Sequence, residues 1–417
     1  MHPNLPNATR RALLLGSGAV FAAAALPRLA RTDERDPRFL AIVLRGGLDG
    51  LAVVAPVGDP NWQKLRGDKA LTLDGATPAL PLDGFFALNP AMPNLHRLYR
   101  DGQALFVHAV ATPYRERSHF DGQDVLESGL PGPGANDTGW LNRAVSALAP
   151  ASARLVRARQ ALAIGPIAPL VMRGPWPLVS WVPPRLPPVG DDTMMRLLDL
   201  YRHTDPTFAA VLEERVGIAA IAHAGGMDAR PAQQTPAVQQ GGIAQVRAYF
   251  AEAAGAAAKF LARPDGPRIG ALAFNGWDTH INEGIAQGRL ADLLGALDGA
   301  IGALETGLGE AWRDTIVALV TEFGRTARIN GNDGTDHGTA TVALFAGGAL
   351  KGGRIVADWP GLRDADLVDN RDLKPTTDLR AVLKGLLRDH LRIDDGRLDA
   401  AVFPDSAAAR PVGGLVA

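Results

Sequence analysis

Short apolar runs recur along this chain of 417 residues, and segments with helical periodicity lie between them. Runs of this kind predict buried strands, and they occupy residues 39–44, 104–111, 269–274, 315–320 and 341–346. Residues 51–55 predict a short continuation of the first strand. Residues 94–101 and 289–308 instead carry apolar side chains at the spacing of an α-helix. Continuous apolar strands that alternate with helices predict an α/β fold, with a mostly parallel sheet covered by helices on both faces.

The region between the second and third strands has a different composition. Residues 155–187 are rich in proline and predict a loop-rich excursion or a small cap. Residues 192–260 are rich in alanine and helical in pattern, with a Gly- and Gln-rich interruption at 233–242. We therefore expect one α/β domain over residues 32–417, with an insertion at about 150–265.

The first 31 residues predict a cleavable signal. Arg10 and Arg11 precede an apolar run, residues 12–26, which Pro27 ends. A positive start followed by a short apolar stretch is typical of a signal peptide, and paired arginines mark the twin-arginine route. We expect the twin-arginine translocase as a partner and the periplasm or the exterior as the destination. A buried N-terminal helix is the structural alternative.

Composition and charge narrow the classes of partner. The chain has no cysteine and therefore no disulfides. Its 43 Lys and Arg residues nearly balance 44 Asp and Glu residues, which gives no reason to expect nucleic acid or an anionic membrane. After residue 31 no apolar segment reaches the ~20 residues of a membrane span, so none is expected in the mature chain.

Carboxylates and histidines follow four of the predicted strands and precede the fifth. In open α/β sheets, sites form beyond the carboxyl ends of the strands. Carboxylate oxygens mixed with imidazole nitrogens are ligands of divalent metals. The candidates are Asp49, Ser118, His119, Asp278, His280, Glu322, Arg325, Asp336 and His337. Their convergence predicts a metal centre at one edge of the sheet.

Several candidates also have ordinary structural explanations. Asp49 is a good turn residue. Ser118 with Asp121 matches a capping box, which is compatible with catalysis because a helix N-terminus stabilises an anion. Glu322 could pair with Arg325 across one turn.

The histidines differ in their expected roles. Asp278 and His280 lie on the same side of an extended segment, because side chains alternate with a period of two. Asp336 and His337 lie in a glycine-rich loop with no evident packing role. His108, inside a predicted strand, is expected to be a core histidine.

Seven segments carry a resemblance to a known family. They are LRGGLDGL (44–51), RSHFDGQDVLESG (117–129), GWLNR (139–143), WDTHIN (277–282), TEFGRTARINGNDGTDHG (321–338), LKGGRIVADWP (350–360) and TTDLRAVL (376–383). On these motifs the chain resembles the bacterial family catalogued as domain of unknown function 1501, a distant branch of the alkaline phosphatase and sulfatase superfamily. The resemblance covers nearly the whole mature chain and implies the superfamily's α/β fold.

The superfamily resemblance implies a centre of one or two divalent ions, with Zn, Mn, Mg and Ca all open. The implied metal ligands are Asp49, Asp278, His280, Glu322, Asp336 and His337. In one register Phe323 replaces a metal-binding histidine of the superfamily's Asp-His-Gly motif. In a second register that motif aligns with residues 336–338, and both registers stay open.

The resemblance also implies catalytic residues. Ser118 matches the nucleophile position. Arg45, His119 and Arg325 are candidates to hold anionic oxygens, and arginine suits this because its guanidinium binds two oxygens at once. The sulfatase Cys-x-Pro-x-Arg signature is absent, so a formylglycine-type sulfatase is not expected.

The sequence leaves three hypotheses for the function of the protein. The leading one is an exported metal-dependent hydrolase of phosphate or sulfate esters, with a serine nucleophile or a metal-activated water. Its substrate would be an anionic ester of a small molecule, a glycan or a lipid head group. The second, motivated by Phe323, is a non-catalytic periplasmic binding or assembly protein with a structural or degenerate metal site. The third is a transferase of phosphoglycan or phospholipid head groups.

Overall fold

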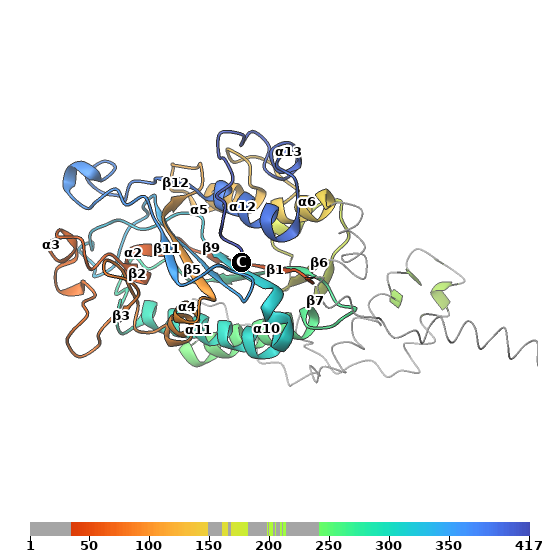
Figure 1. Ribbon diagram of the computed structural model, residues 1–417, viewed down its shortest axis with the longest axis horizontal. Helices are drawn as coiled ribbons and strands as arrows, with labels where there is room; N and C mark the ends of the chain where they lie inside the picture. The colour runs from red at the N-terminus through yellow and green to blue at the C-terminus, as the bar shows by residue number, and fades with distance from the viewer. Residues whose placement is uncertain are drawn as a thin grey trace, which may run out of the picture. The chain divides into compact units, whose positions relative to one another are not determined.

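A nine-stranded sheet forms the centre of the computed structural model (Figure 1). The structure describes residues 35–148, 161–165, 168–181 and 242–417, with a few isolated positions between 198 and 213. The strands lie in the order β11 (Arg354–Val356), β5 (Ala104–Ala111), β10 (Thr341–Ala346), β9 (Thr315–Val320), β1 (Arg38–Arg45), β8 (Ile269–Asn275), β6 (Ala161–Ile164) and β7 (Val179–Trp181), and β12 (Thr377–Asp378) pairs with β5.

The predicted mostly parallel sheet is confirmed. β1 pairs in parallel with β8 on one side and with β9 on the other. β6 pairs in parallel with β8 and β7, and β11 and β12 with β5. β10 alone among the described strands of this sheet runs antiparallel to its neighbours, β5 and β9.

Helices cover both faces of this sheet, as the apolar strands predict (Figure 1). One face packs against α4 (Pro93–Arg100), α10 (Ile243–Leu261) and α11 (Arg289–Leu308); the other packs against α5 (His119–Ser128), α6 (Trp140–Ala147) and α12 (Leu379–Leu391). Alternate residues of β1 enter the two cores, Leu40 and Ile42 the first, Phe39 and Ala41 the second. Both faces of the strand are therefore buried, which explains its unbroken apolar sequence.

The expectation for residues 51–55 is wrong. They form the short helix α2 (Gly50–Val53) and strand β2 (Val54–Ala55), which belongs to a separate small sheet with β4 (Ala87–Leu88) and β3 (Leu80–Pro81). Asp49 causes the change, because its side chain accepts hydrogen bonds from the backbone N–H groups of Leu51 and Ala52 and so begins the helix.

The loop-rich excursion expected at 155–187 also contains part of the main sheet. β6 and β7 extend the sheet beyond β8, and α10 covers its face. These strands have only four and three residues and lie among prolines, so their apolar pattern was too short to be recognised. Much of the rest of the expected insertion lies outside the described residues.

The remaining described elements are short. They include α3 (Trp62–Arg66), α13 (Asp395–Arg397), four 3₁₀ turns (67–69, 170–172, 309–314 and 364–366) and one π turn (398–402). The predicted signal and the boundary after residue 31 lie outside the described residues. Within the described part of the chain, no helix combines the length and apolar character that a membrane crossing requires.

The antiparallel course of β10 determines where the loops meet. Its start at Thr341 lies beside the end of β9, because Leu344 pairs with Leu319 and Ala346 with Val317. The loop between β9 and β10 therefore begins and ends at the edge where β1 and β8 also end. A segment that precedes β10 thus joins segments that follow the parallel strands.

Candidate metal centre

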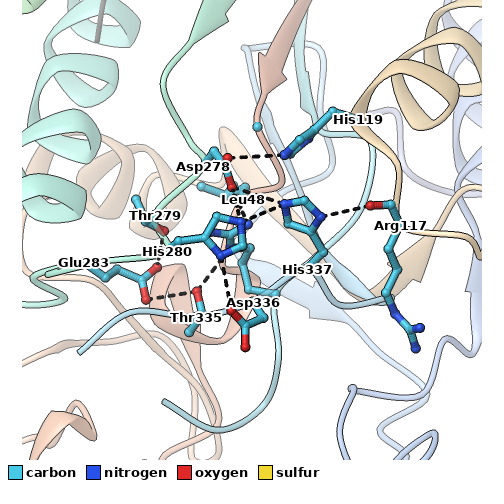
Figure 2. A network of polar contacts seen from close by, with 12 residues as sticks. Leu48, Arg117, His119, Asp278, Thr279, His280, Glu283, Thr335, Asp336 and His337 are labelled. Atoms are coloured by element: carbon cyan, nitrogen blue, oxygen red, sulfur yellow. Dashed lines mark hydrogen bonds and ion pairs between the residues drawn. The ribbon is translucent and has the colours of Figure 1, made fainter. Parts of the chain in front are cut away.

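Three histidines and one aspartate converge at this edge (Figure 2). His119 begins α5, Asp278 and His280 follow β8, and His337 precedes β10. His280 Nε2 lies 3.0 Å from Asp278 Oδ1 and 3.0 Å from His337 Nε2. His337 Nε2 lies 3.3 Å from Asp278 Oδ1, and His119 Nε2 lies 3.5 Å from Asp278 Oδ2. Ligand atoms of His119, Asp278 and His337 all lie within 4.8 Å of one another.

The second nitrogen of each imidazole is anchored by an oxygen outside this group. The anchors are Glu322 Oε1 for His119 (2.9 Å), Asp336 Oδ1 for His280 (3.2 Å) and the backbone oxygen of Arg117 for His337 (2.9 Å). A carbonyl or a carboxylate only accepts, so Nδ1 of each neutral ring donates. The tautomer is thereby fixed, and each Nε2 keeps its lone pair.

The lone pairs of these rings need a cation. His280 Nε2 and His337 Nε2 lie 3.0 Å apart, which is a repulsive contact between two lone pairs unless a proton or a metal ion lies between them. His119 Nε2 is buried and has no hydrogen-bond partner within the described part of the chain. Imidazoles held by outer carboxylates or carbonyls, with the other nitrogen free, are typical of metal-binding histidines. The residues present therefore fit a divalent metal.

The electrostatics of the centre also favour a cation. The carboxylates of Asp278 and Glu322 raise the pKa of His119 to about 9. Partial burial alone would raise the pKa of Asp278, but the neighbouring imidazoles of His119 and His337 and the Arg325 guanidinium outweigh it and hold that pKa well below its usual range. A proton and a metal ion compete for the same lone pairs here.

Glu322 and Asp336, both expected to bind metal, face the Nδ1 atoms of His119 and His280. Glu322 is fully buried and accepts hydrogen bonds from His119, from the Gly46 backbone N–H (2.8 Å) and from Gln123 (3.0 Å). Burial would raise the pKa of Glu322, but the hydrogen bonds from His119 and Gln123 lower it overall. Asp336 is half exposed and, besides His280, accepts from Asn330 (3.1 Å).

Asp49 is not brought into this group. Its Oδ2 lies 2.7 Å from one terminal nitrogen of Arg66, and its Oδ1 lies 3.0 Å from the other. Both side chains are buried, and Arg66 also donates to the backbone oxygen of Ala327 (2.7 Å). The carboxylate is therefore neutralised by an arginine 17 positions away, a pairing that the sequence pattern does not reveal.

Ser118 lies between two residues that contact the centre, since the Arg117 carbonyl anchors His337 and His119 supplies a nitrogen. It occupies the N-cap position of α5, as expected, but its hydroxyl makes no capping hydrogen bond. The expected capping box is also absent, because Asp121 accepts instead from the Tyr114 hydroxyl (3.2 Å). The Tyr114 hydroxyl also accepts from the Ser118 backbone N–H (3.2 Å), so Tyr114 contacts both residues.

The three candidates for holding anionic oxygens make different contacts in the structure. Arg45 pairs with Glu127, its Nε lying 2.8 Å from Oε1. Arg325 reaches the centre, where its fully buried side chain donates to Asp278 Oδ1 (2.8 Å) rather than pairing with Glu322. One terminal nitrogen of Arg325 has no partner within the described residues. His119, the third, lies among the candidate metal donors, and no spacing in the sequence distinguished it.

Phe323 forms an apolar wall of the centre. Its ring centroid lies 5.0 Å from that of His119 and 5.1 Å from that of His337, and the side chain is buried. Phe323 is therefore next to the donors without adding one.

Comparison with known proteins places these residues in a family. The sequence profile described as "Protein of unknown function (DUF1501)" matches residues 103–403. No curated protein sequence matches the chain.

Distant similarities to solved structures also exist. Ps i-CgsB in complex with k-i-k-neocarrahexaose is 12% identical, with a TM-score of 0.41, over 91% of this chain and 77% of that chain. The PsFucS1 sulfatase from Pseudoalteromonas sp. is 12% identical, with a TM-score of 0.35, over 85% and 69%. The phosphonate monoester hydrolase of Agrobacterium radiobacter is 13% identical, with a TM-score of 0.31, over 86% and 74%. Similarities of this strength assign no activity to this chain.

Proposed function

Since the chain belongs to the family of proteins of unknown function DUF1501, whose name assigns no activity, we propose a function from the centre itself. The protein is a metal-dependent hydrolase of phosphate or sulfate esters. One observation carries the proposal: three imidazoles, each fixed through Nδ1, direct Nε2 toward the carboxylate of Asp278. The N-terminus of α5 and the Arg325 guanidinium lie beside this group and supply positive potential for an anionic substrate.

The donor set favours zinc among the ions that the sequence left open. Imidazole nitrogens suit zinc, whereas magnesium and calcium prefer oxygen ligands throughout. Among the described residues one such group is found, and it offers donors for one ion. A bound ion would polarise an ester oxygen and lower the pKa of a bound water.

The protein's own groups have distinct tasks in this proposal. Glu322, Asp336 and the Arg117 carbonyl hold the three rings in one tautomer. Ser118 is the proposed nucleophile: its oxygen bonds to phosphorus or sulfur while the bond to the alcohol oxygen breaks, and the alcohol leaves with a proton. Water then cleaves the serine ester, releases phosphate or sulfate, and restores the hydroxyl.

A second candidate is a binding or assembly protein with a structural metal. One specific observation favours it: His280 Nε2 lies 3.0 Å from Asp278 Oδ1 and adds a protein nitrogen beside the group of His119, Asp278 and His337, and a shell of four protein ligands is typical of structural zinc. X-ray absorption of the zinc-loaded protein separates the two candidates. A shell of four protein ligands supports the structural role, whereas a water in the shell supports catalysis.

The deciding experiment combines metal analysis with an ester screen. We expect about one zinc per purified chain and turnover of at least one phosphate or sulfate ester, both lost in Asp278→Ala. Asp292→Ala, an exposed carboxylate on α11, is the control and retains both. Ser118→Ala should keep the zinc and lose turnover; retained turnover would assign the attack to water. Normal turnover in Asp278→Ala contradicts the proposal.

We also propose export by the twin-arginine translocase and action in the periplasm or outside the cell. The paired Arg10 and Arg11 before a short apolar run support this. Replacing both with lysine should leave the protein in the cytoplasm, as fractionation would measure. Unchanged export of this variant contradicts the assignment.

A further inference from the structure

Glu283 is a fully buried carboxylate that the proposed reaction does not use. Its Oε1 accepts a hydrogen bond from the Thr279 hydroxyl (2.7 Å), and its Oε2 accepts one from the Thr335 hydroxyl (3.1 Å) (Figure 2). Each carboxylate oxygen is thus bound to a different segment of the chain.

These two threonines belong to the two loops that supply most of the metal donors. Residues 278–283 contribute Asp278 and His280, and Thr279 lies between them in the sequence. Residues 330–337 contribute His337, and Thr335 lies two positions before it. One carboxylate therefore joins both loops at positions next to the donors.

Two backbone hydrogen bonds also join the same two loops. The Thr335 N–H donates to the Thr279 carbonyl (3.1 Å), and the Glu283 N–H donates to the Asp333 carbonyl (2.9 Å). The Thr335 hydroxyl also accepts from Arg325 Nε (3.1 Å), and Arg325 in turn donates to Asp278. The hydrogen-bonded chain that starts at Glu283 therefore ends on a metal donor.

A buried carboxylate at this point is costly for folding. Burial of an ionised group is unfavourable unless opposite charge and hydrogen bonds compensate it. Arg66 and Arg325 attract the Glu283 charge, but the buried Asp49 repels it. Well-packed apolar side chains of similar volume would stabilise such a position as well or better. The cost points to a role in geometry rather than in stability.

We propose that Glu283 is a positioning residue that sets the separation of the two loops, and through it the placement of Asp278, His280 and His337. The effect on metal binding rests on the proposed metal centre. The joining of the loops itself does not require the metal.

Zinc affinity of the purified full chain provides the first test, measured by competition with a chelator. Glu283→Ala should weaken binding about 10–100-fold, the range typical of outer partners of metal ligands. Glu283→Gln should weaken it less, because its amide oxygen still accepts from one threonine. Thr279→Val and Thr335→Val should each give an intermediate loss and add little in the Glu283→Ala background.

Asp298→Asn is the matched control. Asp298 is also a buried carboxylate, but it accepts from the backbone N–H groups of Asn94 (3.0 Å) and Leu95 (2.8 Å), at the start of α4. This variant should lower the melting temperature without changing zinc affinity. Equal weakening of zinc binding in Asp298→Asn and Glu283→Gln would overturn the proposal, since both would then act through overall stability.

Histidine-ring ¹⁵N NMR of the zinc-free protein provides a second test that is independent of metal. Glu283→Gln should shift the ring signals of His280 and His337 and leave that of His108 unchanged. If the wild-type chain binds no zinc, the proposed function fails, and these ring signals alone decide the role of Glu283. If Glu283→Gln matches the wild type in both its ring signals and its zinc affinity, the proposed positioning role of Glu283 is overturned.

Discussion

The histidine of β5 and the histidines of the candidate metal centre place the same side chain in contrasting surroundings. His108 is fully buried, and both ring nitrogens are satisfied within the chain: Nε2 lies 2.9 Å from the Val54 carbonyl, and Nδ1 accepts from the Ala109 N–H (2.8 Å). The rings of His119, His280 and His337 are 24–39% exposed; an outer oxygen anchors Nδ1 of each, and Nε2 of each faces the shared carboxylate of Asp278. The feature that separates these histidines from the core histidine is therefore a ring nitrogen that faces a shared carboxylate, rather than burial alone.

The largest expected effect comes from removing one histidine of each kind and comparing the two variants. His280→Ala should weaken zinc binding by more than about 100-fold, beyond the range of outer partners, because a donor is lost. His108→Ala should leave zinc affinity unchanged and lower the free energy of unfolding by about 3 kcal/mol, because it opens a cavity and leaves a buried carbonyl unpaired. Chelator competition and urea denaturation measure the two quantities. Similar losses of zinc affinity in both variants would contradict the distinction.

A smaller effect is expected from the anchors. Glu322→Ala frees the His119 ring to change tautomer and orientation and should weaken zinc binding about 10–100-fold. Glu322→Gln should do less, because its amide oxygen can still accept from Nδ1. Glu127→Gln, at the buried carboxylate that binds Arg45, is the control and should retain full affinity. A zinc affinity for Glu322→Ala equal to that of the wild type would count against the anchoring role.

The free energy of unfolding should depend on pH in opposite directions through two buried groups, His108 and Glu283. Burial lowers the pKa of His108 from 6.5 to about 4, so the folded state binds fewer protons than the unfolded state between those values. Its contribution is present above pH 6.5 and is lost as pH falls toward 4, by about 3 kcal/mol. His108→Gln should therefore flatten the acid side of the stability profile.

Glu283 should act in the opposite direction. Burial first, and then the charge of Asp49, raise the pKa of Glu283 above its ordinary value of 4.5. Its contribution to stability is therefore fully present below pH 4.5 and is lost as pH rises. Glu283→Gln should make stability rise more steeply with pH than in the wild type, in urea denaturation of the zinc-free protein from pH 4 to 8. Equal slopes for all three proteins would contradict both assignments.

The smallest expected effect lies far from either kind of histidine. Arg247 on α10 and Asp292 on α11 form an exposed ion pair at 3.0 Å. Water screens such a pair, so Arg247→Ala should change the free energy of unfolding by no more than about 0.5 kcal/mol. A larger change in urea denaturation would show that the two helices depend on this contact.

The sequence predicted those elements in which the apolar pattern runs through the whole element. The strands 104–111, 315–320 and 341–346 and the helix 289–308 match the structure to the residue, because apolar periodicity and burial coincide there. β6 and β7 were not predicted because a strand of three or four residues carries too little pattern.

The sequence predicted which residues lie together in the candidate centre better than it predicted what each of them contacts. Asp278, His280 and His337 meet because strand ends meet, which the strand pattern already implies. The position of Asp49 depends on Arg66, and that of Glu322 depends on the ring of His119; both are contacts between segments distant in the sequence. Periodicity carries no information on such contacts, so a carboxylate that binds a metal and one that holds its ligand look alike.

The place of β1 in the sheet bears on when the protein can acquire a metal. β1 is the first strand of the sheet to be synthesised, yet its two partners, β8 and β9, begin at Ile269 and Thr315. The middle of the sheet cannot close until most of the chain has left the ribosome, and pairings at this separation form slowly. His337 comes later still. Any ion that the proposed centre holds can therefore bind there only after nearly the whole chain has been synthesised.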